Sequence, residues 1–120
     1  MNNKNIKILE IAVPDMNDSF SRVVLDGTQY LIRFTWNEKA QRWSFGVFNM
    51  QKEPLAQGIR IVPRFPLNLQ IVNEKFPRGL FGAYTNLPFV GRDDFKNGNA
   101  TFAYISEVQE GRNGIIQSPV

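Results

Sequence analysis

The sequence contains no cysteine and no histidine. Without cysteine the chain can form neither a disulfide framework nor a thiolate metal site, so packing alone must stabilise it. Without histidine it lacks the commonest general base and the commonest metal ligand, and most hydrolase templates are excluded. We therefore expect a protein with no enzymatic activity, no catalytic residues, no metal and no cofactor.

Long apolar runs are also missing. No stretch approaches the roughly 18 residues that a membrane helix needs. The first five residues, Met-Asn-Asn-Lys-Asn, lack the apolar core of a signal peptide. We expect a soluble protein without membrane insertion and without a Sec-type address.

Runs of like charge are absent as well. Fourteen Lys and Arg against 11 Asp and Glu give a net charge of +3, spread along the whole chain. Nucleic-acid footprints are usually clustered basic patches, so a solvated surface is the simpler interpretation and nucleic-acid binding is not expected. The 120 residues, 42% of them apolar, predict a single domain over residues 1–120 with one hydrophobic core.

The clearest local signal that is present is an Asp26-Gly27 dipeptide between two apolar runs, Val23–Leu25 and Thr28–Trp36. A two-residue type I′ turn needs a positive φ at both central positions, which Asp and Gly tolerate. The sequence therefore predicts a β-hairpin, in which Leu25 pairs with Thr28.

That register assigns the hairpin residues to two faces, because side chains alternate along a strand. The face predicted to cover the core carries Val23, Leu25, Tyr30, Ile32, Phe34 and Trp36. The opposite face is a mixture of apolar residues and arginines that includes Phe20, Arg22, Leu31 and Arg33. Such a face suits a half-covered or partner-facing surface.

Period-two alternation and turn signals recur along the chain and predict further strands. The expected strands are Ile6–Val13, Ser19–Leu25, Arg42–Asn49, Leu55–Gln57, Ile59–Val62, Leu80–Thr85 and Ala100–Val108. Residues 64–92 are expected to be irregular and rich in proline and phenylalanine, with room for a short helix or strand near 67–72. The fold class is all-β, a small antiparallel sandwich or a partly open barrel, and residues 109–120 are expected to form a flexible or partner-dependent tail.

Three sequence features could indicate catalysis or ligand binding, and each has a simpler structural interpretation. The adjacent carboxylates Asp93-Asp94 lie in a loop where aspartate is favoured by turn geometry. The Gly79-Leu-Phe-Gly82 segment lacks the Lys-Ser/Thr of a phosphate loop and is interpreted as a turn. The alternating aromatics could stack nucleic-acid bases, but a hydrophobic core demands the same spacing. A small β-barrel that binds single-stranded nucleic acid is therefore the alternative hypothesis.

The hairpin belongs to a longer pattern: Leu25-Asp26-Gly27-x-x-Tyr30, Arg33-x-x-Trp36-Asn37, Arg42-Trp43 and Pro54-Leu55-x-x-Gly58-Ile59-x-Ile61-Val62-Pro63. This ordered set resembles the small plug-type baseplate proteins of contractile-tailed bacteriophages, known from a cyanophage baseplate. The segment from Asp94-Phe95 to Thr101-Phe-Ala-Tyr104 is similar to the closing strand of that family.

The resemblance implies a non-enzymatic virion component that assembles in the host cytoplasm into the tail baseplate. Its expected partners are the hub and tail-tube proteins, bound in several copies so as to plug or connect the central channel. Residues that could be buried on assembly are the candidate interface: Phe20, Arg22, Leu31, Arg33, Ile115 and Ile116.

Overall fold

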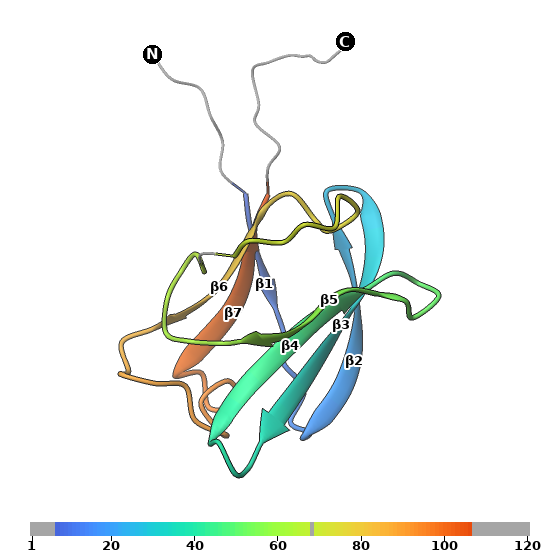
Figure 1. Cartoon of the computed structure of the whole chain (residues 1–120). Coiled ribbons are helices and arrows are strands. Elements are labelled where there is room, and N and C mark those ends of the chain that lie inside the picture. The colour runs from blue at the N-terminus through green and yellow to red at the C-terminus, as the bar shows by residue number, and fades with distance from the viewer. Residues whose placement is uncertain (1–6, 68, 107–120) are drawn as a thin grey trace, which may run out of the picture.

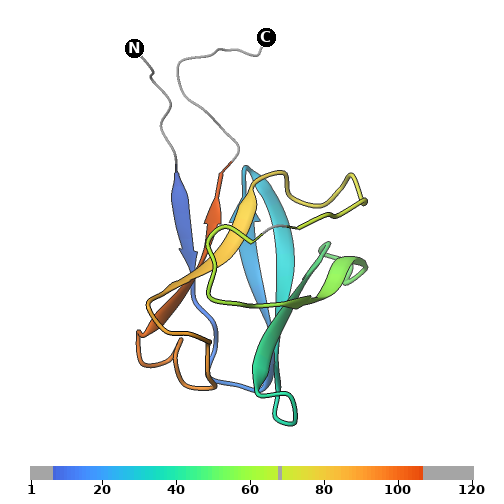
Figure 2. The same ribbon diagram turned by 60° about the vertical axis from the view of Figure 1, so that its left-hand side comes forward.

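Seven strands form two antiparallel sheets that pack face to face in the computed structural model, which describes residues 7–67 and 69–106 (Figures 1 and 2). The strands are β1 (Ile8–Ile11), β2 (Asp18–Leu25), β3 (Thr28–Asn37), β4 (Arg42–Phe48), β5 (Pro54–Arg60), β6 (Leu80–Thr85) and β7 (Ala100–Ile105). One sheet has the order β1-β7-β6 and the other β2-β3-β4-β5. The described residues contain no helix, so the all-β prediction is confirmed, as a sandwich rather than a closed barrel.

The Asp26-Gly27 turn joins β2 and β3 as the sequence predicts. Both residues have a positive φ, 52° at Asp26 and 84° at Gly27, which is the backbone of a type I′ turn. Leu25 pairs with Thr28, and Val23 pairs with Tyr30. The predicted register is therefore confirmed.

The hydrophobic core lies between the two sheets and is mainly aromatic. Phe34, Phe45 and Phe102 are 0–1% exposed, and their rings come from both sheets. The Phe102 ring centroid lies 5.2 Å from that of Phe34 and 4.9 Å from that of Phe45. The Trp36 and Trp43 ring centroids lie 5.5 Å apart near the β3–β4 turn. The interpretation of the alternating aromatics as core is confirmed.

The structure corrects several expected boundaries. Gly58 does not end a strand: it lies inside β5 with a φ of 72°, where the pairing with β4 shifts register as in a β-bulge. The first strand is shorter than predicted, because β1 covers Ile8–Ile11. The described residues of 67–72 form neither helix nor strand. The predicted Leu80–Thr85 strand is confirmed as β6, so Gly82 is a strand residue and not part of a turn.

One side of the sandwich is closed by the segment that follows β5. The Ile61 amide donates to the Trp43 carbonyl at 2.9 Å, which holds the start of this segment on β4. Farther along, the Leu67 amide donates to the Phe81 carbonyl at 2.7 Å, and the Ala83 amide donates to the Arg64 carbonyl at 3.0 Å. Residues 61–67 therefore cross from one sheet to the other and cover the outer edge of β6.

A buried tyrosine links the hairpin turn to the second sheet. The Tyr104 hydroxyl donates to Asp26 Oδ2 at 2.7 Å and accepts the Gly79 amide at 2.8 Å. The Ser106 hydroxyl donates to the other oxygen of the Asp26 carboxylate. Burial, followed by the Asp26 carboxylate, raises the pKa of Tyr104 well above its usual value. Folding therefore favours the neutral phenol.

Replacing Tyr104 by phenylalanine is expected to cost about 1 kcal/mol at neutral pH, because the Gly79 amide loses its acceptor. Because folding raises the pKa of Tyr104, the protonated hydroxyl stabilises the folded state fully at pH values below the ordinary tyrosine pKa of about 10. This contribution to the free energy of unfolding is lost as the pH rises through the folded-state pKa of Tyr104. Chemical unfolding from pH 8 to pH 11 should show a smaller alkaline loss in the variant. An identical alkaline loss in both proteins would refute the linkage.

Candidate partner-docking surface

The four described residues of the predicted interface lie together on the outward face of the larger sheet. Phe20 of β2 is opposite Arg33 of β3, and Arg22 is opposite Leu31. Their neighbours on the inward face form the core, so these side chains point away from it. Phe20 lies on the edge strand β2 and is 41% exposed, which is high for a phenylalanine. The two other candidates, Ile115 and Ile116, lie outside the described residues.

Phe20 lies within an aromatic and cationic cluster. Its ring packs edge-on against Phe48 of β4 at 5.3 Å. The Arg33 guanidinium carbon lies 5.7 Å from the Phe20 ring centroid, and Lys52 Nζ lies 5.1 Å from it. Cations at this distance from an aromatic face are attracted to its π electrons. The cluster therefore presents an apolar ring with two positive charges beside it.

The Arg33 side chain is held in place by Asp18. Arg33 Nε and Nη2 donate to the two Asp18 carboxylate oxygens at 2.8 and 2.6 Å. This two-pronged hydrogen bond lowers the pKa of Asp18 below its usual value. Because the side chains of both partners are exposed, 42% for Arg33 and 51% for Asp18, the pair adds little to stability. Its main effect is to orient the guanidinium beside Phe20.

The outward face as a whole is positively charged. The residues that the strand register places on this face include four arginines and one aspartate: Arg22, Arg33, Arg42, Arg60 and Asp18. Such a potential favours association with an acidic surface and disfavours a basic one.

Two members of the cluster were not predicted from the sequence. Phe48 pairs with Leu31, and alternation along β4 from Trp43 already places it outward. The β3–β4 register could therefore have identified it. Lys52 lies in the turn between β4 and β5, and no periodic signal indicates where its side chain goes.

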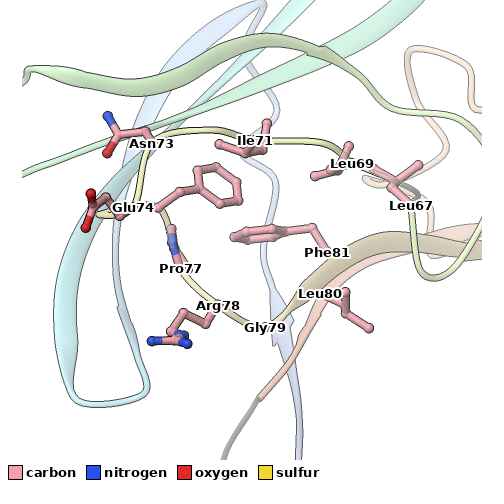
Figure 3. A pocket seen from close by; sticks show the side chains of 11 residues that line it. Leu67, Leu69, Ile71, Asn73, Glu74, Pro77, Arg78, Gly79, Leu80 and Phe81 are labelled. Atoms are coloured by element: carbon pink, nitrogen blue, oxygen red, sulfur yellow. The ribbon is translucent and has the colours of Figure 1, made fainter.

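A separate hollow of about 640 Å³ lies between β6 and the segment 67–79 (Figure 3). Its floor is apolar, with Leu67, Phe76 and Phe81, and its rim carries Glu74 and Arg78. Figure 3 shows the Phe81 side chain under the loop that carries Ile71 and Leu69. Among the described residues that line the hollow, Glu74 is the one carboxylate.

The adjacent carboxylates Asp93 and Asp94 organise a loop. Asp94 Oδ2 accepts the Gly91 amide at 2.6 Å, and Asp94 Oδ1 accepts the Asn99 side-chain amide at 3.3 Å. Asp93 lies 3.8 Å from the Arg92 guanidinium.

Within residues 7–67 and 69–106, no group of three His, Cys, Asp or Glu side chains could hold a metal ion. In the same residues, no helix is long and apolar enough to cross a membrane.

Comparison with known proteins identifies a family for this all-β chain. No curated protein matches this chain. Residues 6–107 match the model of one protein family, described as cyanophage baseplate Pam3 plug gp18. The match spans both sheets and the whole outward face, and a baseplate plug is a structural component of the phage tail. The chain therefore belongs to the cyanophage baseplate plug family, and its place is the tail baseplate of a virion.

Proposed function

We propose that this protein docks on the hub and tail-tube proteins of the baseplate and helps to plug or connect the central channel, without enzymatic activity. The family match over residues 6–107 is the observation that carries the proposal. Several copies of the protein are incorporated into each baseplate while the baseplate is assembled in the host cytoplasm. The protein binds through its outer surface, and the hub and tail-tube proteins provide the complementary surface.

The docking surface in this proposal is the outward face around Phe20. A phenylalanine that is 41% exposed and flanked by Arg33 and Lys52 can insert into an apolar depression rimmed by acidic residues. The four arginines of this face would be repelled by a basic partner. We therefore assign Phe20, Arg22, Leu31 and Arg33 to the hub contact, and Ile115 and Ile116 to further buried contacts in the assembly.

Substituting Phe20 or Leu31 with lysine is expected to block incorporation into tail particles while leaving the isolated domain folded. A lysine at either position places a charge where the contact needs an apolar group. Incorporation is measured by the amount of the protein in purified particles, and folding by circular dichroism. Phe89→Lys is the matched control, because Phe89 is 65% exposed and lies in the connection between β6 and β7. Normal incorporation of the Phe20 and Leu31 variants would remove the proposed surface.

Single-stranded nucleic acid is the second candidate partner, because Arg33 and Lys52 beside an exposed Phe20 ring also suit a stacked base. Titration of fluorescent oligonucleotides at two salt concentrations distinguishes the two partners. Phosphate contacts would give an affinity that falls steeply with salt. We expect no binding even at low salt. Salt-dependent binding that Phe20→Ala weakens would favour the nucleic-acid function instead.

A further inference from the structure

The strand β2 is the outermost strand on one side of the larger sheet (Figure 1). An exposed sheet edge carries unpaired backbone groups to which a further strand can bond. A hollow of about 510 Å³ adjoins this edge and is lined on one side by residues 21–24. Within the described residues no strand pairs with β2 on this side, so the edge is open to a partner.

The other three edges of the two sheets are each protected. β1 is only four residues long, and the pairing of β5 shifts register near Gly58. The edge of β6 is covered by the crossing segment 61–67. In contrast, β2 pairs with β3 over eight consecutive residues without a shift. Short, irregular and covered edges resist strand addition, and β2 has none of these three protections.

The ladder with β3 determines which backbone groups of β2 are free. The Trp36 amide donates to the Asn17 carbonyl at 2.8 Å, just before β2 begins. In an antiparallel pair every second residue bonds to the same neighbour, so Ser19 and Ser21 also direct their backbone groups to β3. The even-numbered residues of β2 therefore direct their amides and carbonyls to the free edge.

The outward side chains of β2 are self-complementary about Phe20. Asp18 lies two residues before Phe20 and Arg22 two residues after it, and the two carry opposite charges. A two-fold rotation at Phe20 places Asp18 of each copy opposite Arg22 of the other and brings the two Phe20 rings together. Cross-strand pairs of opposite charge and of aromatic rings both stabilise a sheet. Arg22 is exposed and has no carboxylate partner within the described residues, so its guanidinium is available.

The inward face in the same register supplies a partner for a buried hydroxyl. Ser19 Oγ is buried and has no hydrogen-bond partner within residues 7–67 and 69–106. Burying an unpaired hydroxyl costs free energy. Rotation about Phe20 brings Ser19 of one copy opposite Ser21 of the other, at a position where the backbones do not bond to each other. Side chains are closest in such pairs, so the two hydroxyls can form a hydrogen bond.

Two neighbouring registers match less well. A rotation centred on Arg22 places two guanidinium groups opposite each other, and like charges in that position repel. A rotation centred on Ser21 places Arg22 opposite Phe20 and leaves the Ser19 hydroxyl opposite Val23, which offers no polar atom. Of the three registers, the one centred on Phe20 alone pairs both the charges and the hydroxyls.

We propose that a second copy of this chain adds to the free edge of β2, so that the two four-stranded sheets join into one antiparallel sheet centred on Phe20. Backbone hydrogen bonds, two Asp18–Arg22 pairs and two Ser19–Ser21 pairs hold the copies together. The outward faces of both copies then form one continuous surface, because paired strands keep their side chains on the same sides. The pairing concerns the purified protein alone and does not depend on the baseplate contact.

Cysteine cross-linking tests the register, and the cysteine-free chain is well suited to it. Ser19→Cys and Ser21→Cys chains of distinguishable mass are purified separately and oxidised mildly, each alone or both as an equal mixture. The proposed pairing places residue 19 opposite residue 21 and never opposite itself. We expect the mixed disulfide to form about tenfold faster than either self-linked product. Equal rates in the three reactions would overturn the register at Phe20.

Sedimentation equilibrium of the full-length chain measures the dimer itself. We expect Arg22→Glu to raise the dissociation constant about tenfold, because each dimer contains two Asp18–Arg22 pairs and both become repulsive. Arg60→Glu is the matched control, since it makes the same change of charge on the opposite edge strand β5 and should leave the constant unchanged.

Two results of this measurement would contradict the proposal. A dimer as stable in Arg22→Glu as in the parent chain would refute the pairing at Phe20. A chain that stays monomeric up to its solubility limit would also refute it, and would leave the edge of β2 to a strand of a different protein. Because neither experiment uses tail particles, its failure is distinct from a failure of the hub contact.

Discussion

Replacing Phe102 by alanine is expected to lower the free energy of unfolding by about 3–5 kcal/mol. Phe102 is completely buried, and its ring contacts those of Phe34 and Phe45 in the larger sheet and Phe81 in the smaller one. It also contacts Phe95 in the loop before β7, at 6.5 Å. The substitution therefore opens a cavity at the centre of the sandwich, where both sheets lose packing at once. Because these rings are held by strand backbones, the surroundings can close the cavity only partly.

The size of this loss can be compared with the total stability of a domain, which is about 5–15 kcal/mol. Urea unfolding monitored by tryptophan fluorescence measures it, since Trp36 and Trp43 are both buried. Phe89→Ala is the matched control, because Phe89 is 65% exposed and should lose less than about 1 kcal/mol. If the two variants were equally stable, Phe102 would not be at the centre of the core.

Replacing Gly82 by alanine is the second large perturbation, with an expected cost of about 2–3 kcal/mol. A Cβ atom at this position would collide with Phe65 Cδ1 and would lie 2.8 Å from the Arg64 carbonyl oxygen. The second neighbour is a backbone atom that also accepts the Ala83 amide, so it cannot move without breaking that bond. The crossing segment 61–67 must then leave the edge of β6.

The structural consequence separates this effect from a general loss of stability. Gly82→Ala should raise hydrogen exchange at the Ala83 and Leu67 amides, because their hydrogen bonds join β6 to the crossing segment 61–67. Gly27→Asn is the control, because nothing lies within 4 Å of a Cβ there and asparagine tolerates a positive φ. We expect the control to remain within about 1 kcal/mol of the parent chain. Normal protection at Ala83 in Gly82→Ala would contradict the clash.

Much of the larger sheet could be predicted from the sequence. The Asp26-Gly27 turn and the alternation that follows it are local signals, and together they determine the pairing of β2 with β3. The same register brings Phe20 next to Arg33 and Arg22 next to Leu31, so these four of the six candidate interface residues share one face of the sheet as predicted. Whether that face meets a hub protein stays a prediction.

The cationic environment of Phe20 could be predicted only in part. Arg33 follows from the hairpin register, but Lys52 reaches the same ring from the β4–β5 turn, thirty-two residues farther along the chain than Phe20. Side chains in a turn do not alternate with a fixed period, so their direction cannot be predicted from the sequence pattern. The contact exists because β3 alone separates β2 from β4 in the sheet, so that Phe48 at the end of β4 reaches the Phe20 ring across β3 and the following turn lies nearby.

The elements that have local signals follow from the sequence: the hairpin, the alternating strands, the aromatic core positions and the all-β class. How those elements close into a sandwich depends on contacts between distant parts of the chain. Gly82 was interpreted as part of a turn, yet it is a strand residue that stays small because Phe65 packs on it. Asp26 was interpreted as a turn residue, yet its carboxylate also accepts the Tyr104 hydroxyl, 78 residues away in the chain. Such contacts join segments that are distant in sequence, and no local propensity encodes which of them will meet.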